Sequence, residues 1–168
     1  MSKSKIMIVE DESIIAEDLA DSLENMGYIV VDIVPSGEEA ILMAAEKQPH
    51  LILMDVMLQG EIDGITAAEE IYSSLQIPII FLTAYSDNQT LQRVKATNPF
   101  GYIVKPFEER NLYLTIEIAL ERHHYDPITH LPNRFLFKSK LDEILSHENG
   151  DNLGNLYHIN AVSYTHLR

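Results

Sequence analysis

The stretch LILMDVML, residues 51–58, is apolar except for one carboxylate, Asp55. A short apolar run of this kind is typical of a strand that is buried on both faces of a parallel sheet. An unpaired charge among such neighbours is costly, because burial removes its hydration. We therefore expect Asp55 to reach solvent or to have dedicated polar partners, and these partners are the first guide to function.

The composition is that of an ordinary globular protein, with 46% hydrophobic and 23% charged residues in a chain of 168. This length suffices for one well-packed domain and a remnant. The absence of cysteine excludes disulfides, thiolate metal sites and thiol nucleophiles. We find no apolar run long enough to span a membrane and no signal-peptide core, so we expect a cytoplasmic protein with no membrane partner.

The formal net charge is −14, and the basic residues form no patch along the sequence. A strongly acidic protein repels the phosphate backbone of DNA and RNA. We therefore expect no nucleic-acid partner.

Short β-branched runs alternate with helical patterns along the chain, which predicts an α/β fold with a doubly wound, five-stranded parallel sheet. The expected strands cover 5–9, 28–34, 51–55, 78–83 and 101–104.

The helices between these strands have recognisable ends. Ser36 with Glu39 forms a capping-box pattern, Asp63 and Asp87 are N-cap candidates, and Gly27 is a natural C-cap. A fifth helix is predicted from about residue 108 to 124.

Polar residues with useful chemistry stand at the carboxyl ends of the predicted strands, where doubly wound sheets bind their ligands. Glu10 and Asp11 follow the first strand, Asp55 ends the third, Thr83 ends the fourth and Lys105 follows the fifth. Carboxylates on neighbouring strands begin about 5 Å apart, so they need a cation between them. Hard oxygen ligands beside an open position suit a Mg²⁺ ion that keeps several waters.

Asp55 then has a metal, a hydroxyl and an ammonium around it. The Thr83 hydroxyl can donate to a phosphoryl oxygen, and Lys105 carries a point charge on a long side chain. This is the environment of a phosphate-accepting nucleophile. Taken singly, each residue is also compatible with a helix cap, a solvated loop or an ordinary surface position, but their coincidence at the strand ends favours the functional interpretation.

Four motifs at these positions resemble the receiver domain of two-component response regulators, over about residues 4–124. They are IVEDE (8–12), LILMDVMLQGEIDG (51–64), FLTAY (81–85) and GYIVKPF (101–107). The resemblance implies a flavodoxin-like strand order of 2-1-3-4-5 with a C-terminal helical extension, and we assign residues 1–124 to this domain. It also implies a phosphorylation-dependent signalling switch that is not itself an enzyme.

The same resemblance assigns the metal site. Asp55 would be the phosphoacceptor, and Mg²⁺ would be held by Glu10, Asp11, Asp55 and the backbone carbonyl of Met57. The donor would be a sensor histidine kinase or a phosphotransfer protein.

The resemblance also assigns the switch. Thr83 would be the switch hydroxyl, Tyr102 the switch aromatic and Lys105 the ligand of the phosphoryl group. The Lys105–Pro106 peptide bond is expected to be cis.

The fifth predicted helix carries two apolar stripes. The stripe that would dock it on the sheet comprises Leu112, Ile116, Ala119 and Leu120. Leu114 and Ile118 lie roughly 200° away, with Tyr125 continuing their line. An exposed second stripe is typical of a partner surface. We therefore expect a homodimer through the fourth helix, the fifth strand and the fifth helix.

A second, shorter resemblance follows this domain. DPITHLPNRFLF (126–137) is similar to the opening of a GGDEF-type diguanylate cyclase domain, yet the chain has no Gly-Gly pair. We interpret residues 125–156 as a truncated start of such a domain and residues 157–168 as a non-native or disordered tail. The alternative function is therefore a fragment of a diguanylate cyclase whose catalytic part is missing.

Two further functions fit the sequence less well. Hydrolases with an Asp nucleophile on a similar sheet require a second Asp two residues later, where this chain has Met57. Flavin binding would require a Ser/Thr/Gly-rich phosphate loop after the first strand, where this chain has the acidic EDES (10–13).

Overall fold

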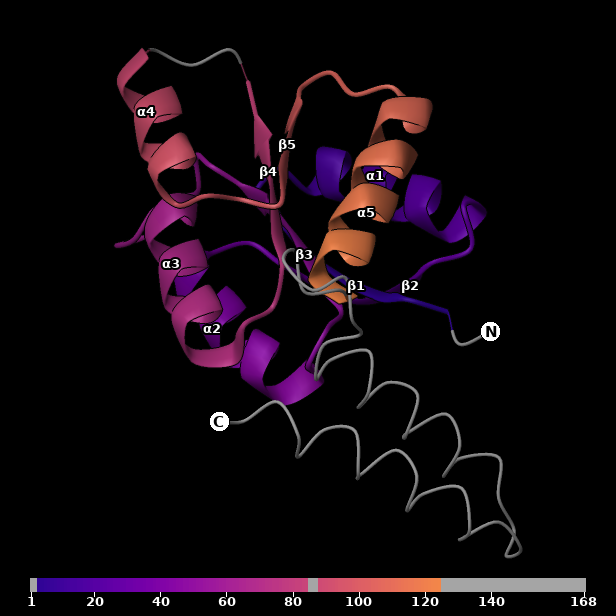
Figure 1. Ribbon diagram of the computed structural model, residues 1–168, viewed down its shortest axis with the longest axis horizontal. Helices are drawn as coiled ribbons and strands as arrows, with labels where there is room; N and C mark the ends of the chain where they lie inside the picture. The colour runs from indigo at the N-terminus through magenta and orange to yellow at the C-terminus, as the bar shows by residue number, and fades with distance from the viewer. Residues whose placement is uncertain (1–2, 85–87, 125–168) are drawn as a thin grey trace, which may run out of the picture.

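A computed structural model describes residues 3–84 and 88–124, in which five strands and five helices alternate strictly (Figure 1). Their bounds are β1 Lys5–Val9, α1 Ser13–Asn25, β2 Ile29–Val34, α2 Gly37–Lys47, β3 Leu51–Asp55, α3 Gly64–Leu75, β4 Ile79–Thr83, α4 Asn88–Ala96, β5 Gly101–Val104 and α5 Glu109–His124. Each predicted strand is confirmed to within one residue.

All five strands are parallel and lie in the order β2-β1-β3-β4-β5, which confirms the predicted doubly wound sheet. β3 is central, because it pairs with β1 on one side and β4 on the other. Its five residues are all buried, as the apolar run at 51–54 predicts.

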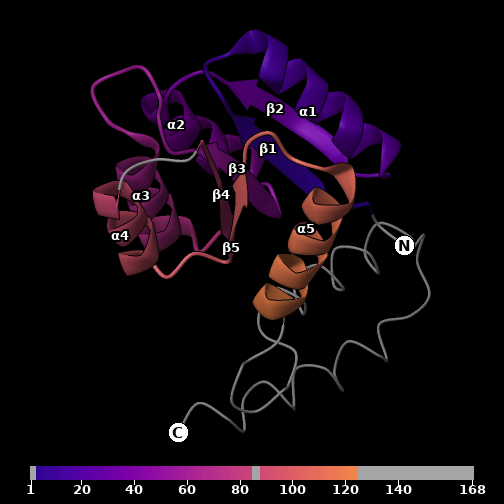
Figure 2. The ribbon, with the colours of Figure 1, turned by 90° about the horizontal axis from the view of Figure 1, so that it is seen from above.

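Helices cover both faces of the sheet. Figures 1 and 2 show α1 and α5 on one face and α2, α3 and α4 on the other. Alternate β3 side chains face opposite layers: Ile52 and Met54 join the core beneath α2 and α3, whereas Leu51 and Leu53 join the core beneath α1 and α5. Burial on both faces explains why β3 needs an uninterrupted apolar run.

The predicted helix signals are confirmed where the structure describes them. The Ser36 hydroxyl accepts from the N–H of Glu39 at 3.3 Å, and the Asp63 carboxylate accepts from the N–H of Thr66 at 2.9 Å. The C-cap of α1 is Met26, and Gly27, predicted as the cap, lies one residue beyond it with a φ of +94°, a left-handed conformation that favours glycine.

Several predictions fall outside the described residues. These are the N-cap at Asp87, the extension of the second α5 stripe to Tyr125, the truncated domain at 125–156 and the tail at 157–168. Within residues 3–84 and 88–124, none of the helices has the length and apolar character that crossing a membrane requires.

Candidate functional site

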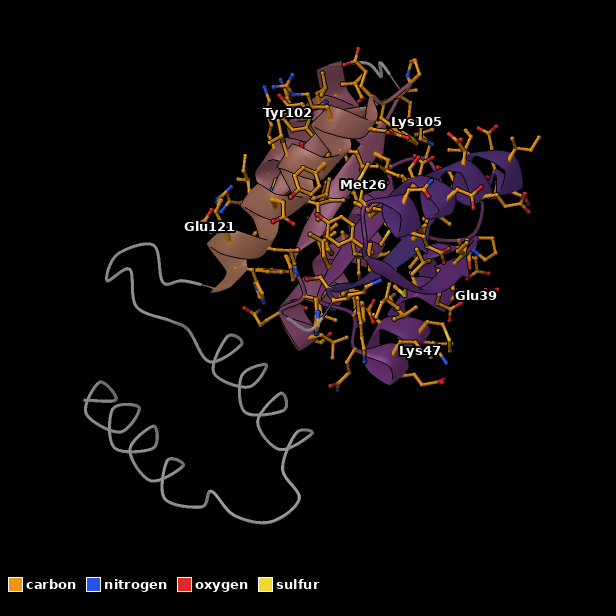
Figure 3. All side chains as sticks on the ribbon, turned by 90° about the vertical axis from the view of Figure 1, so that its right-hand side faces the viewer. Met26, Glu39, Lys47, Tyr102, Lys105 and Glu121 are labelled. Atoms are coloured by element: carbon orange, nitrogen blue, oxygen red, sulfur yellow. The ribbon has the colours of Figure 1, made fainter. Side chains whose placement is uncertain are left out.

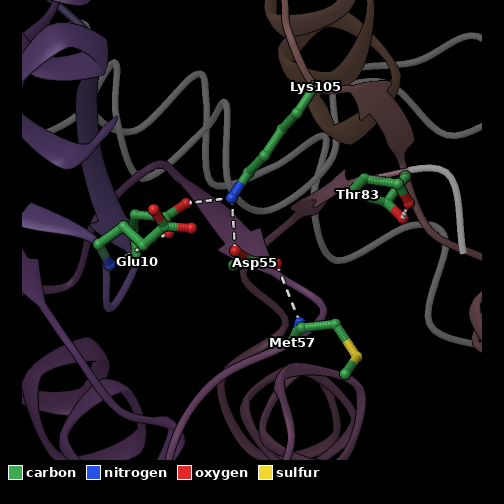
Figure 4. A network of polar contacts seen from close by, with 7 residues as sticks. Glu10, Asp55, Met57, Thr83 and Lys105 are labelled. Atoms are coloured by element: carbon green, nitrogen blue, oxygen red, sulfur yellow. Dashed lines mark hydrogen bonds and ion pairs between the residues drawn. The ribbon is translucent and has the colours of Figure 1, made fainter. Parts of the chain in front are cut away.

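The structure brings the predicted site residues to one edge of the sheet. Glu10 follows β1, Asp55 ends β3 and Lys105 follows β5, and their charged groups meet above the strand ends (Figure 4). Thr83, the last residue of β4, lies on the same edge. This convergence follows from the parallel arrangement, since every strand delivers its last residue to the same side.

Lys105 joins the two buried carboxylates. Its Nζ lies 2.6 Å from Glu10 Oε2 and 2.5 Å from Asp55 Oδ2. The Glu10 side chain has no exposed area, and those of Asp55 and Lys105 are 8% and 14% exposed. The long lysine side chain lets β5 reach carboxylates that are held by two other strands. Asp55 thus has dedicated partners, as the cost of burying its charge requires.

The cluster shifts the titration of its members. Burial raises the pKa of the Glu10 carboxyl, and the nearby charge of Asp55 raises it further, against the lowering effect of Lys105. Burial alone would lower the pKa of Lys105, but its hydrogen bonds to Asp55 and Glu10 outweigh burial and raise it. Lys105 is therefore firmly cationic at neutral pH.

The donor set fits a hard divalent cation. One carboxylate oxygen each of Glu10, Asp11 and Asp55 lie within 4.8 Å of one another. All three are oxygen ligands, and few enough to leave room for waters, which suits Mg²⁺. The Met57 N–H donates to Asp55 Oδ1 at 2.9 Å, so the residue whose carbonyl is the predicted fourth ligand lies beside the cluster. The Met57 side chain itself points away and is 67% exposed.

The two predicted switch residues occupy different environments. Thr83 is buried, and its hydroxyl donates to the carbonyl of Ala84 at 2.7 Å. Tyr102 lies on β5, three residues before Lys105, and is 57% exposed. Figure 3 shows Tyr102 and Lys105 near the same end of the molecule. The Lys105–Pro106 bond is cis, as expected.

The backbone packs tightly behind Asp55. A Cβ added at Gly64, the first residue of α3, would lie 1.8 Å from the carbonyl oxygen of Asp55. Only glycine permits α3 to begin this close to the end of β3. The Gly64 N–H also donates to the carbonyl of Val56 at 3.2 Å, which closes the β3–α3 loop.

One contact near the site was not foreseen from the sequence. Glu38, at the start of α2, accepts hydrogen bonds from two N–H groups of the β3–α3 loop. The donors, Glu61 and Ile62, lie 23 and 24 positions after Glu38, so no local sequence pattern connects them.

The arrangement is suited to nucleophilic chemistry at Asp55. The carboxylate is ordered by Lys105 and by the Met57 N–H, and it faces a group of oxygen ligands that suits a cation. Positive charge around such a nucleophile permits the approach of an anionic phosphoryl group, and transfer of that group depends mainly on positioning and charge neutralisation.

A family model described as the response regulator receiver domain matches residues 6–117. The transcriptional regulatory protein PdtaR of Mycobacterium tuberculosis is 39% identical over 118 residues, which cover 70% of this chain and 57% of that protein. The phyllosphere-induced regulator PhyR of Methylorubrum extorquens is 34% identical over 118 residues, or 70% of this chain and 43% of that protein. The match therefore spans only about half the length of these relatives.

Solved structures show the same architecture. The signal receiver domain of a modulated diguanylate cyclase from Desulfovibrio desulfuricans superposes with a TM-score of 0.70 at 38% identity, covering 73% of this chain and 97% of that one. The receiver domain of a sensor histidine kinase from Pseudomonas aeruginosa, with a magnesium ion in its active-site cleft, has a TM-score of 0.65 at 27% identity and covers 71% and 98%.

Proposed function

Because this chain belongs to the family of response regulator receiver domains, we propose that it is a switch in which Asp55 accepts a phosphoryl group. The observation that carries this proposal is the pairing of Asp55 with Lys105 at the carboxyl edge of the sheet, 2.5 Å apart and largely buried. A buried carboxylate that is ordered and paired with an ammonium in this way is suited to attack phosphorus. Named relatives of the chain are regulators, in agreement with a signalling role rather than an enzymatic one.

In the proposed transfer, an Asp55 oxygen forms a bond to phosphorus while the bond from phosphorus to the donor breaks. With a sensor histidine kinase or phosphotransfer protein as donor, the broken bond is P–N and the histidine leaves with the electron pair. Lys105 remains protonated and balances the charge on the phosphoryl oxygens, and the Met57 N–H orients the attacking carboxylate. We place this exchange in the cytoplasm.

Mg²⁺, held by Glu10, Asp11, Asp55 and the Met57 carbonyl, would neutralise phosphoryl charge when bound. The convergence of three carboxylates supports these ligands. The magnesium-containing cleft described for the P. aeruginosa receiver domain supports the same metal.

The proposed response is a change in the surface formed by α4, β5 and α5. A phosphoryl group on Asp55 would attract the Thr83 hydroxyl away from the Ala84 carbonyl. Tyr102 would then turn from its exposed position toward the vacated space. The exposed Leu114 and Ile118 on α5 would form part of a homodimer interface, so phosphorylation would tune association.

The output of a longer parent protein is a separate matter. The likeness to the receiver domain of a modulated diguanylate cyclase supports a cyclase output for such a parent. In that case, paired receivers would bring two output domains together. The residues that carry the cyclase resemblance, 126–137, lie outside the described part of the chain.

Incubation with acetyl phosphate and MgCl₂, followed by intact-mass measurement, tests the proposed function. We expect one phosphoryl group on the wild-type protein and none on Asp55→Asn. Asp11→Asn should require more Mg²⁺ to reach the same yield. A wild-type yield of phosphoprotein from Asp55→Asn would refute the assignment.

A further inference from the structure

The β3–α3 loop, residues 56–63, leads from Asp55 to α3 and contains Met57. At its base the loop is closed by the hydrogen bond from the Gly64 N–H to the Val56 carbonyl. Between these anchors the chain must project from the sheet edge and return. The Met57 N–H is held by Asp55 at 2.9 Å, whereas the direction of the Met57 carbonyl also depends on what holds the outer part of the loop.

Glu38 supplies a contact to that outer part. One oxygen of its carboxylate, Oε1, accepts from the N–H of Glu61 at 2.8 Å and from the N–H of Ile62 at 3.2 Å. A carboxylate that accepts from two backbone N–H groups makes charge-assisted hydrogen bonds, which are stronger than neutral ones. The loop is thereby tied to a helix that contributes no residue to the phosphoryl site.

The carboxylate also packs directly on the loop backbone at Gly60. A Cβ at this position would lie 2.9 Å from Glu38 Oε2, and Gly60 has a φ of +141°, which disfavours any other residue. The absence of a side chain lets the loop turn and lets Glu38 approach it. Both features indicate that the contact is built into the loop conformation.

The start of α2 is itself fixed against the loop. A Cβ at Gly37 would lie 2.9 Å from the Ile62 side chain and 3.1 Å from Ala67 of α3. The Ser36 hydroxyl caps α2 by accepting from the Glu39 N–H. Glu38 thus projects from a rigid helix end that packs on the loop it holds.

The charge state suits this role. Hydrogen bonds from its own backbone N–H, and then from those of Glu61 and Ile62, lower the pKa of the Glu38 carboxyl. Its position in the first turn of α2 also favours negative charge, since the helix dipole is positive there. The acceptor is therefore ionised at neutral pH.

We propose that Glu38 is a positioning residue for the phosphoryl site, which holds the β3–α3 loop so that the Met57 carbonyl faces the acidic cluster. This inference rests on the proposed function, in which the Met57 carbonyl is a ligand of Mg²⁺. Glu38 acts through the loop and touches neither metal nor phosphoryl group. Its loss should weaken Mg²⁺ binding while leaving the chemistry at Asp55 intact.

Titration calorimetry of the whole chain with MgCl₂ tests the proposal. We expect Glu38→Ala to raise the Kd for Mg²⁺ by at least about threefold, which is less than the roughly tenfold or larger effect of losing a direct partner of a metal ligand. Glu38→Gln, which keeps one acceptor oxygen, should have a smaller effect. Glu39→Ala is the matched control, because Glu39 is an exposed acid in the same helical turn.

The rate of phosphorylation by acetyl phosphate, measured at several Mg²⁺ concentrations, distinguishes a positioning role of Glu38 from partial unfolding of the variant. Glu38→Ala should need more Mg²⁺ for half-maximal rate but reach the wild-type rate at saturation, whereas a partly unfolded protein would lose maximal rate. Hydrogen exchange of the Glu61 and Ile62 amides should quicken in the same variant. If Glu38→Ala does not fold, the isosteric Glu38→Gln provides the same comparison with a smaller expected shift.

Unchanged Mg²⁺ affinity in the folded Glu38 variants would overturn the inference, as would an equal loss in Glu39→Ala. Failure of the proposed function has a different signature. In that case the wild-type protein binds Mg²⁺, but the phosphoryl group never appears on Asp55. A wild-type protein that does not bind Mg²⁺ overturns both proposals.

Discussion

The carboxyl edge of the sheet buries charge, whereas the outer face of β5 and α5 exposes apolar side chains. At the edge, Glu10 and Asp55 are only 2% and 6% exposed when backbone and side chain are counted together. On the outer face, Tyr102, Leu114 and Ile118 are 57%, 48% and 53% exposed. Each region thus reverses the usual distribution, in which charges lie outside and large apolar groups lie inside.

The two reversals differ in how they are stabilised. The buried carboxylates have a cationic partner within the chain, since Lys105 binds both Glu10 and Asp55. The exposed apolar groups would be covered only by another molecule. The two regions meet on one segment, because Tyr102 of β5 is three residues from Lys105. A change of charge at the first region therefore has a short path to the second.

Removal of Lys105 should have the largest effect on stability, because this residue is the cationic partner of Glu10 and Asp55. We expect Lys105→Met to lower the free energy of unfolding by about 3 kcal/mol at pH 8, because it leaves two carboxylates buried without their cation. Millimolar Mg²⁺ should restore part of the loss. Urea unfolding measures both effects, and Lys47→Met is the control, since the Lys47–Glu46 pair is exposed.

The loss of stability in Lys105→Met should depend on pH. Burial raises the pKa of Glu10, and the loss of Lys105 removes an influence that lowers it. An acid whose pKa is raised on folding binds its proton more tightly in the folded state, so stability falls as pH rises through that pKa. The deficit of Lys105→Met should therefore be smaller at pH 5 than at pH 8. Equal deficits at the two pH values would show that Lys105 does not stabilise the ionised form of Glu10.

Charged substitutions on the exposed apolar face of α5 should weaken association of the protein with itself and leave the phosphoryl site at the carboxyl edge unchanged. We expect Leu114→Glu/Ile118→Glu to weaken, at least about tenfold, the proposed dimer in the presence of beryllofluoride, a phosphoryl mimic, because the substitutions place like charges in the interface. Sedimentation velocity with and without beryllofluoride measures this. Ile33→Glu/Leu42→Glu alters exposed apolar residues of β2 and α2 and should sediment like the wild type. Identical sedimentation of both double variants would remove α5 from the interface.

A smaller effect is expected for a hydrogen bond between α5 and the residue that precedes β2. Tyr28, which precedes β2, donates its hydroxyl to Glu117 of α5 at 2.6 Å. Tyr28→Phe should cost about 1 kcal/mol at pH 7. Tyr72→Phe, at an exposed position of α3, is the control.

The contribution of Tyr28 should have its own pH window. Burial, followed by the hydrogen bond to Glu117, raises the pKa of the Tyr28 phenol. A raised pKa gives stability that is complete below the ordinary tyrosine value of about 10 and declines as pH rises above it. The difference between wild type and Tyr28→Phe should thus be constant from pH 7 to 9 and shrink near pH 11. A constant difference across this range would contradict the burial of the phenol.

The sequence predicted most of the fold because local signals agreed with the global pattern. The apolar run at 51–54 specifies a central strand, and Ser36 and Asp63 mark helix starts by capping. The predicted docking stripe of α5 is confirmed, with Leu112, Ile116 and Ala119 fully buried. The exposure of Leu114 and Ile118 is also as predicted, whereas their role in a dimer stays a prediction.

The site was predictable in its members but not in its contacts. Parallel strands deliver their last residues to one edge, so the meeting of Glu10, Asp55 and Lys105 follows from topology. That one ammonium would bind both carboxylates depends on side-chain length and on strand twist, which the sequence does not specify. Glu38 was missed for a similar reason, because its partners are distant in sequence and are backbone groups. The glycine at position 60 was the one local sign of a sharp turn there.

We propose that Asp55, in the buried-charge region, is the residue that takes the phosphoryl group. The most direct measurement is borohydride reduction of the acetyl phosphate-treated protein, which converts an aspartyl phosphate to homoserine, followed by peptide mass spectrometry. We predict homoserine at position 55, dependent on Mg²⁺, and unmodified aspartate at position 11. Homoserine at another acidic residue, with position 55 unchanged, would contradict the account.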